Sequence, residues 1–286
     1  MHIIEAKELL SAQNGMNLYR GCTHGCIYCD ARSRCYHIDH AFEDVAVKGN
    51  APALLEAALR KKRKKCMIGT GAMSDPYIPL ERELRLTRRC LELIERYGFG
   101  LAIQTKSDHI LDDLDLLVSI NERARCVVQM TITTFDDALC KLVEPNVCPT
   151  SARLAALSAL HARGIPTVVW LSPLLPFLND TEQNVRSILS ACAQAGVGGV
   201  LCFGMGVTMR EGNREYFYRQ LDRRFPGLRE MYEQTFGYAY ECTSPQNDAL
   251  MRVFYAEIQR YGMFCGVERV FSYLAQPPED KGPKLF

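Results

Sequence analysis

The stretch NLYRGCTHGCIYCDARSRC, residues 17–35, places four of the thirteen cysteines of this 286-residue chain in one short segment. Cys22, Cys26 and Cys29 follow the spacing C-x3-C-x2-C, and Cys35 comes six residues after Cys29. Three thiolates this close together can hold one metal centre and leave one of its positions free for another ligand. The spacing therefore predicts that these three cysteines bind a metal centre. The alternative is a closed zinc or cluster site with four cysteine ligands, which would recruit Cys35.

The composition is that of a globular chain with a sizeable core. Hydrophobic residues make up 48% of it, charged residues 23%, and the formal net charge is +1, which argues against dependence on phosphate attraction over the whole surface. No apolar run reaches transmembrane length, and residues 1–15 carry acidic residues where a signal peptide needs basic ones. We therefore expect a cytoplasmic protein without a membrane partner, in which most cysteines are reduced.

Strand and helix signals alternate along most of the chain. Apolar or β-branched runs typical of strands lie at 16–20, 66–71, 99–106, 125–134, 165–173 and 199–204, and a further extended segment lies at 45–48. Helical patterns lie between them at 51–65, 79–98, 110–120, 150–164 and 180–196, the last opening with an Asp–Thr cap. Buried strands that alternate with helices predict parallel pairing through right-handed crossovers.

Six such units predict an α/β fold, a partial (β/α)6 TIM-type barrel over residues 1–210 that includes the cysteine loop 21–36. In such barrels the chemistry lies at the carboxyl ends of the strands. After residue 210 the strand pattern stops. Helices near 212–224 and 245–261, followed by an irregular tail, predict a helical C-terminal extension, residues 211–286, packed on the barrel.

The cysteine spacing after the first strand, with Tyr28 just before the last cysteine, resembles the radical S-adenosylmethionine (SAM) enzymes, a superfamily with a partial-barrel fold. Further segments over about residues 16–203 resemble the spore photoproduct lyase-like branch of that superfamily. They read LYRGCTHGCIYCDAR, VKGNAP, GAMSDPYIPLE, LTRRCLELI, QTKS, TITTFDD, LVEPN, RLAALSALHARGIPT and SPLLPFLND.

The resemblance implies a [4Fe-4S] cluster on Cys22, Cys26 and Cys29 whose fourth iron binds SAM. Reduction by an external flavodoxin- or ferredoxin-type protein would cleave SAM to methionine and a 5′-deoxyadenosyl radical, which abstracts hydrogen from a substrate.

The resemblance also implies which residues contact SAM. Ser74 and Asp75 match contacts to the methionyl amine, and Lys106 matches a contact to the SAM carboxylate, where a cation is physically apt. Thr131 matches a contact to the ribose, although strand packing alone also accounts for it. Tyr28 lies near the adenine or braces the loop.

One departure from the lyase concerns the hydrogen atom that is returned to the product. The lyase uses a cysteine two positions before the Ser-Asp pair, and this chain has Ala72 there. Cys242, expected in a loop, is a candidate replacement donor. Cys140 and Cys148 follow the fourth strand. Cys242, Cys140 and Cys148, together with Cys35 and Cys265, are candidate ligands for an auxiliary cluster. No second group of closely spaced cysteines supports such a cluster.

Two basic features bear on a nucleotide or nucleic acid as the substrate. The run RKKRKK, residues 60–65, is expected on the barrel face opposite the site, where it caps a helix end. Arg210 and Arg214 follow the sixth strand and either bind an anionic substrate or simply begin the C-terminal helix. Three hypotheses therefore stand: a radical SAM enzyme with an unidentified substrate, a DNA photoproduct lyase-like repair enzyme, and a non-catalytic four-cysteine binding module. The sequence leaves the oligomeric state open.

Overall fold

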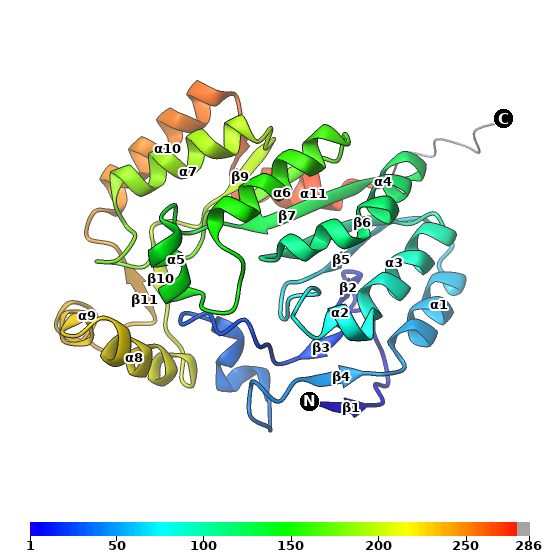
Figure 1. Ribbon diagram of the computed structural model, residues 1–286, viewed down its shortest axis with the longest axis horizontal. Coiled ribbons are helices and arrows are strands. Elements are labelled where there is room, and N and C mark those ends of the chain that lie inside the picture. Colours follow the sequence, from blue (N-terminus) through cyan, green and yellow to red (C-terminus); the bar gives the residue numbers. More distant parts are fainter. Residues whose placement is uncertain (279–286) are drawn as a thin grey trace.

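The computed structural model describes residues 1–278, and its centre is one parallel sheet (Figure 1). The strand order is β12-β9-β8-β7-β6-β5-β2, and every neighbouring pair is parallel. The strands are β2 (Gly15–Met16), β5 (Met67–Thr70), β6 (Gly100–Thr105), β7 (Cys126–Thr131), β8 (Thr167–Trp170), β9 (Gly199–Leu201) and β12 (Phe264–Cys265). Consecutive strands lie side by side, which confirms the prediction of a partial TIM-type barrel.

The outer face of the sheet is covered by helices that alternate with the strands (Figure 1). They are α1 (Ala51–Lys61), α3 (Leu86–Arg96), α4 (Leu114–Arg123), α6 (Thr150–Ala162), α7 (Glu182–Gln194) and α10 (Asn247–Tyr261). The Asp–Thr cap predicted for α7 is present, because the side-chain oxygen of Thr181 accepts a hydrogen bond from the backbone of Asn184 at 3.2 Å. Helices on one face leave the other face of the sheet to form the barrel interior.

The barrel interior is filled at its lower end by α11 (Val267–Ala275). Val270 and Leu274 of this helix are buried in one apolar cluster with inward-facing side chains of five strands, namely Met67, Ala102, Val127, Val168 and Leu201. Side chains two positions further along each strand point to the same face. Those positions therefore lie above this layer, toward the carboxyl ends of the strands.

The prediction that strands end near residue 210 is wrong, whereas the two helices predicted beyond it are confirmed by α8 (Asn213–Arg224) and α10. β12 pairs with β9, and β10 (Gly206–Thr208) forms an antiparallel pair with β11 (Glu241–Thr243). Helix α9 (Leu228–Phe236) lies between them in the chain. Strands of two or three residues are too short to show an alternating pattern, which explains why the sequence did not reveal them.

The predicted strand at 16–20 is divided between two sheets. Met16 belongs to β2, whereas β3 (Tyr19–Arg20) joins β1 (His2–Ile4) and β4 (Ala46–Lys48) in a small separate sheet of order β1-β4-β3. The extended segment at 45–48 is thus confirmed as β4. The single helix predicted at 79–98 is broken into α2 (Glu81–Leu84) and α3 by Arg85, whose φ of 47° is left-handed.

Short elements complete the chain. In the described part of the chain, the 3-10 helices are η1 (Asp30–Arg32) and η2 (Arg34–Tyr36) in the cysteine loop and η3 (Asp108–Asp113) before α4, and α5 (Asp137–Val143) follows β7. The predicted irregular tail, 276–286, lies mostly outside the described residues. Within residues 1–278, no helix has both the length and the apolarity to cross a membrane.

Candidate functional site

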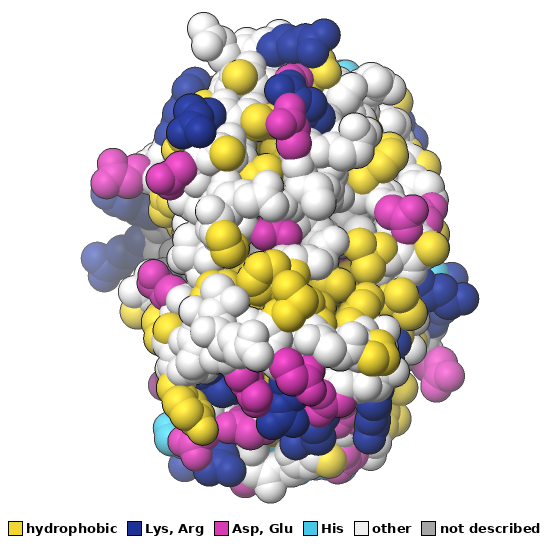
Figure 2. All heavy atoms as spheres, turned by 90° about the vertical axis from the view of Figure 1, so that its left-hand side faces the viewer, with side chains coloured by type: hydrophobic (Ala, Val, Ile, Leu, Met, Phe, Trp, Pro, Cys, Tyr) yellow, Lys and Arg dark blue, Asp and Glu magenta, His cyan; other side chains and the backbone are white. Residues whose placement is uncertain are grey.

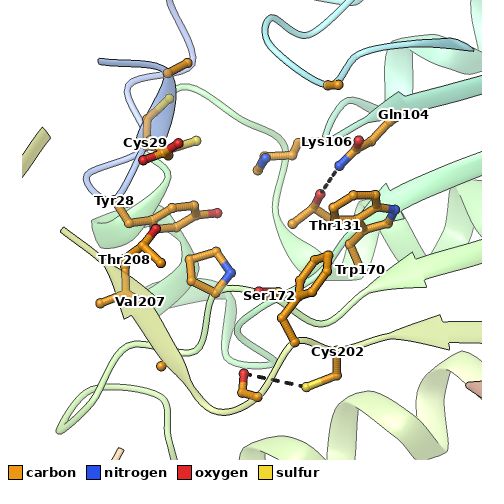
Figure 3. Close-up of a pocket in the computed structure, with 18 of the residues that line it drawn as sticks. Tyr28, Cys29, Gln104, Lys106, Thr131, Trp170, Ser172, Cys202, Val207 and Thr208 are labelled. Atoms are coloured by element: carbon orange, nitrogen blue, oxygen red, sulfur yellow. Dashed lines mark hydrogen bonds between the residues drawn. The ribbon is translucent and has the colours of Figure 1, made fainter. Parts of the chain in front are cut away.

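The site is a cavity of about 860 Å³ at the carboxyl ends of the barrel strands. Cys22, Cys26 and Cys29 line it together with Lys106. Figure 3 shows Lys106 extending into the cavity between Cys29 on one side and Trp170 on the other. The structure thus brings the three predicted cluster ligands to the edge of the barrel where chemistry is expected.

The path of the cysteine loop depends on two glycines with positive φ. Gly21 has a φ of 87°, and a Cβ there would lie 2.3 Å from the carbonyl oxygen of Phe42. Gly25 has a φ of 71°, and a Cβ there would lie 3.2 Å from Pro145. Since other residues rarely adopt this backbone conformation, the glycines beside the cysteines let the loop fold over the cavity.

The thiol environment fits a bound metal cluster. Burial raises the pKa of all three thiols, that of Cys22 to about 12, so without a metal they are protonated. The backbone N–H of His24 points at the Cys22 sulfur at 3.5 Å, and the Lys106 ammonium favours thiolates at all three positions. A cluster would displace these protons, since metals bind the thiolate form. We conclude that these residues suit a cluster held by three cysteines.

Asp75 holds the end of β5 to the end of β6. Its Oδ1 accepts hydrogen bonds from Thr105 Oγ1 at 2.7 Å and from the Tyr77 backbone at 2.8 Å. Its Oδ2 accepts one from the Lys106 backbone at 2.7 Å and lies 3.5 Å from Nδ1 of His24. The neighbouring Ser74 donates to the carbonyl of Tyr19 at 2.8 Å. Both residues line the cavity, and both also fix its wall.

The imidazole of His24 is buried under the cysteine loop. Burial lowers its pKa, although Asp75 acts in the opposite direction. The ring is therefore neutral at neutral pH and adds no charge beside the thiols.

The hydroxyl of Tyr28 is part of a buried network below the loop. It donates to Glu144, and Glu144 is paired with Arg153; the side chains of this pair are 1% and 0% exposed. Arg153 also donates to the carbonyls of Cys148, at 2.9 and 3.1 Å, and of Thr131, at 3.0 Å. Burial and the Glu144 charge raise the pKa of Tyr28 well above its ordinary value. The Arg153 guanidinium holds the pKa of Glu144 below the ordinary carboxyl value. The ring lines the cavity while the hydroxyl braces the loop.

Polar side chains of β6 and β7 face the cysteine loop across the cavity. Gln104 and Thr131 line it, and Gln104 Nε2 lies 3.5 Å from Thr131 Oγ1 (Figure 3). The Lys106 ammonium is disfavoured by burial, but Cys26, Glu144 and Asp75 outweigh this effect and raise its pKa. Lys106 is therefore charged, as a contact to a carboxylate requires.

The remaining predicted cysteines occupy different surroundings. Cys242 lies in β11 and not in a loop; it is buried and lines the cavity. Cys140 is buried beside Glu144, and Cys148 donates to the carbonyl of Lys106 at 3.2 Å. Cys35 is exposed, and Cys265 lies in β12. Ala72 lines the cavity at the position of the lyase cysteine.

No three His, Cys, Asp or Glu side chains in residues 1–278 converge closely enough to chelate a single metal ion. A four-iron cluster does not require such convergence, because each cysteine binds a different iron. The auxiliary cluster stays a prediction.

The basic residues considered for substrate binding are largely engaged. Arg214 donates to the backbone carbonyls of four residues, Met209, Gly237, Tyr238 and Ala239, at 2.8–3.2 Å. Arg210 donates to Tyr240 at 2.9 Å and to Cys35 at 3.2 Å, and lies 3.6 Å from Asp30. The run at 60–65 lies between α1 and the amino end of β5, away from the cavity.

The fold and the site together are those of a partial barrel with three cysteines at the carboxyl ends of its strands, a site that suits a metal cluster. The family profile of the radical SAM superfamily matches residues 16–224, and the chain belongs to this superfamily. Its members use a [4Fe-4S] cluster and SAM, which confirms the predicted class of enzyme and its cofactors.

Two uncharacterized relatives show the extent of the sequence similarity. A Mycobacterium tuberculosis protein is 31% identical over 229 residues, which cover 77% of this chain and 66% of the relative. A Methanocaldococcus jannaschii protein is 34% identical over 181 residues, 63% of this chain and 67% of the relative. The chain thus spans about two thirds of the length of these relatives.

Solved structures support the fold. Spore photoproduct lyase complexed with dinucleoside spore photoproduct superposes with a TM-score of 0.67 over 92% of this chain and 80% of the lyase, at 14% identity. The radical SAM methyltransferase TsrM of Kitasatospora setae, with tryptophan and a SAM analogue bound, gives 0.51 over 78% of this chain and 39% of that protein, at 15% identity. The lyase-like fold is confirmed; these similarities do not extend to the reaction.

Sequence reasoning missed several residues of the site, namely His24, Gln104, Glu144, Arg153 and Trp170. One signal was available for Arg153. It lies in α6 on the same side as Ala156, Leu157 and Leu160, and a charged residue on an apolar helix face indicates a buried partner.

Proposed function

We propose that this chain reductively cleaves SAM and that the 5′-deoxyadenosyl radical abstracts hydrogen from a substrate held in the same cavity. The observation that carries the proposal is the presence of Cys22, Cys26, Cys29 and Lys106 in the wall of one cavity at the strand ends. A [4Fe-4S] cluster bound there supplies the electron for the cleavage.

The residues of the chain have distinct roles in this proposal. The three cysteines hold the cluster, and the Lys106 charge offsets that of the thiolates and attracts the SAM carboxylate. Asp75 accepts three hydrogen bonds, and a carboxylate has about four acceptor sites, so one remains for the methionyl amine next to Ser74. Thr131 and Gln104 offer polar groups to the ribose. The cavity wall excludes water from the reacting groups.

The test is anaerobic reconstitution, followed by addition of SAM and dithionite and measurement of 5′-deoxyadenosine and methionine. We expect both products from the parent protein and neither from Cys29→Ala. Cys35→Ala is the matched control, because Cys35 is an exposed cysteine of the same loop that does not line the cavity. We expect it to keep the full iron content and product yield.

Two outcomes would overturn the proposal. If iron and SAM bind but neither product appears on reduction, the chain is not a radical initiator. If Cys35→Ala loses iron as completely as Cys29→Ala, a closed four-cysteine site and the binding-module hypothesis are favoured.

For Cys242 we propose the role of hydrogen donor to a substrate radical. Burial raises the pKa of this thiol, which keeps the S–H bond that a hydrogen donor needs. With a substrate in hand, solvent deuterium should enter the product of the parent protein. Persistence of that label in Cys242→Ala would exclude the role.

A second candidate function is repair of a DNA photoproduct, favoured by the similarity to spore photoproduct lyase over most of the chain. It predicts binding to oligonucleotides that weakens steeply with salt. Because Ala72 stands where the lyase has its cysteine, this function would need another residue as the hydrogen-atom donor. Salt-independent binding, or none, would count against this function.

The partners follow from the proposed chemistry. The electron comes from a flavodoxin- or ferredoxin-type protein in the cytoplasm, and the test is whether a reduced flavodoxin replaces dithionite in the release of 5′-deoxyadenosine.

A further inference from the structure

The cavity wall opposite the cysteine loop is aromatic. Trp170 at the end of β8 and Phe203 after β9 both line the cavity, with ring centroids 5.8 Å apart. Phe271 of α11 lies 6.1 Å from the Trp170 ring and 6.4 Å from the Phe203 ring. Phe203 is 55% exposed, so its apolar ring is available for contact with a ligand, whereas Phe271 is 44% exposed and supports the two lining rings without lining the cavity itself. We call these three residues the aromatic wall.

A hydrogen bond to Gln129 fixes the orientation of the Trp170 ring. Its indole Nε1 donates to Oε1 of Gln129 at 2.9 Å, and Gln129 is buried in β7. Trp170 faces the cavity from the side opposite Tyr28 and Cys29 (Figure 3). Because its one polar group is already bonded, the ring offers the cavity an apolar surface in a set position.

The cavity lining offers little positive charge to a phosphate group. Lys106 is the one Lys or Arg among the cavity-lining residues that the structure describes, and it faces the three cysteines. Glu241 in the wall is acidic, and the guanidinium groups of Arg210 and Arg214 at the rim already have acceptors. Binding of a nucleic acid strand depends on free cationic groups. Among the described residues that line the cavity, Lys106 is the one such group, and it lies on the cysteine side.

The cavity is near the upper end of the size range of small-molecule sites. Its volume of about 860 Å³ is large for small-molecule sites, which span about 300–1,000 Å³. Met251 and Tyr255 of α10 and Val267 of α11 add apolar surface to the aromatic side. Figure 2, which views the side that carries β10, β11, α8 and α9 in Figure 1, shows hydrophobic side chains gathered in a band across this face.

We propose that the aromatic wall is a substrate subsite for an uncharged planar ring, which packs against Trp170 and Phe203 while the reacting position faces the cysteine loop. The inference rests on the proposed function and adds the substrate class, a neutral aromatic or heteroaromatic small molecule without phosphate. Gln129 is a positioning residue in this subsite, because it acts through the Trp170 ring.

The experiment measures binding of three probes to the anaerobically reconstituted protein with SAM present: indole, p-cresol and the dinucleotide thymidylyl-thymidine. We expect indole and p-cresol to bind by saturation-transfer NMR, independently of salt, and the dinucleotide not to bind. Phe203→Ala should weaken indole binding about tenfold, the loss typical of a stacking contact. Phe203 is largely exposed, so its truncation leaves the core packing intact.

The matched control is Phe135→Ala. Phe135 is 44% exposed, against 55% for Phe203, but it does not line the cavity, so indole binding should equal that of the parent. Gln129→Met should weaken indole binding and shift the fluorescence of Trp170, the one tryptophan of the chain.

Three results would overturn the subsite: no binding of indole or p-cresol to the parent, equal losses in Phe203→Ala and Phe135→Ala, or preferred, salt-sensitive binding of the dinucleotide. The last result would favour the repair function. Failure of the proposed function is seen separately, as absence of 5′-deoxyadenosine from the same preparation.

Discussion

The two sides of the cavity are built in opposite ways. On the cysteine side, buried polar groups hold one another: Asp75 joins two strand ends, and Tyr28, Glu144 and Arg153 form a closed network. On the other side, Phe203 is an exposed ring that makes no hydrogen bond through its side chain. The first side lies within the residues that match the superfamily, whereas much of the second comes from α10 and α11, beyond residue 224.

Under the proposed function, the cysteine side holds the cofactor for the reaction, and the aromatic side selects the substrate. Fully partnered buried charges fix positions, which suits the placement of a cofactor that the whole superfamily shares. Apolar rings at an opening bind by shape and can be exchanged with little effect on the fold. We therefore expect substitutions on the cysteine side to reduce stability, and those on the aromatic side to change which ligand binds.

The strongest test of this comparison is Arg153→Met, which leaves Glu144 buried without its cationic partner. We expect the free energy of unfolding to fall by about 3–5 kcal/mol, the cost of breaking a buried ion pair from one side. Urea unfolding followed by Trp170 fluorescence measures this change.

The control is Arg229→Met. Arg229 pairs with Asp222 and Glu233, but all three side chains are 40–46% exposed. Exposed pairs contribute about 0–1 kcal/mol, so this variant should unfold almost as the parent does. Equal effects of the two substitutions would show that the cysteine side does not depend on its buried charge.

A smaller effect is expected from Tyr28→Phe, which removes one hydrogen bond to Glu144 and keeps the ring. The loss should be about 1–3 kcal/mol, because a buried acceptor is left with fewer donors. The yield of 5′-deoxyadenosine per intact cluster then separates the two roles predicted for Tyr28. A fall in this ratio indicates a part in the chemistry, and an unchanged ratio indicates a brace.

The smallest effect concerns Asp180, a buried carboxyl that does not line the cavity and accepts a hydrogen bond from Ser244 at 2.5 Å, next to β11. Burial raises its pKa, so the folded state binds this proton more tightly than the unfolded state does. Its contribution to stability is complete below the ordinary carboxyl pKa of about 3.9 and is lost as the pH rises through the folded value.

Asp180→Asn removes this titration, so the free energy of unfolding should depend less on pH between about 4 and 7. The difference between this variant and the parent should be smaller than the loss of stability expected for Tyr28→Phe. Unfolding curves across this range test it. A profile identical to that of the parent would mean that the titration of Asp180 does not affect stability.

The barrel could be predicted from the sequence where the pattern extends over enough residues. The runs at 99–106 and 125–134 are mostly apolar or β-branched because β6 and β7 are covered on both faces, and they were recognised for that reason. The cysteine spacing and the motifs around Asp75 and Lys106 pointed to residues that do line one side of the cavity, whereas their role as cluster and SAM ligands stays a prediction.

The rest depends on contacts between distant segments. Phe264 occupies space beside Gly199, where a Cβ would lie 2.4 Å from its ring, and no local pattern connects two residues so far apart in the chain. The partnership of Tyr28 with Glu144 spans 116 positions. The aromatic wall combines β8, the segment after β9, and α11, and it is recognisable only once these elements are folded together.

The position of α11 has a consequence for the order in which the protein is made. This helix fills the lower barrel, and β12 covers the free edge of β9, so the nascent chain cannot complete its cavity before about residue 275 has left the ribosome. The cysteine loop emerges about 240 residues earlier, roughly 10–50 s at typical elongation rates. In the last part of this interval, after β9 has been made and before α11 follows, Val168 and Leu201 have no covering helix and the edge of β9 has no neighbour, which makes this the period of greatest exposure to aggregation.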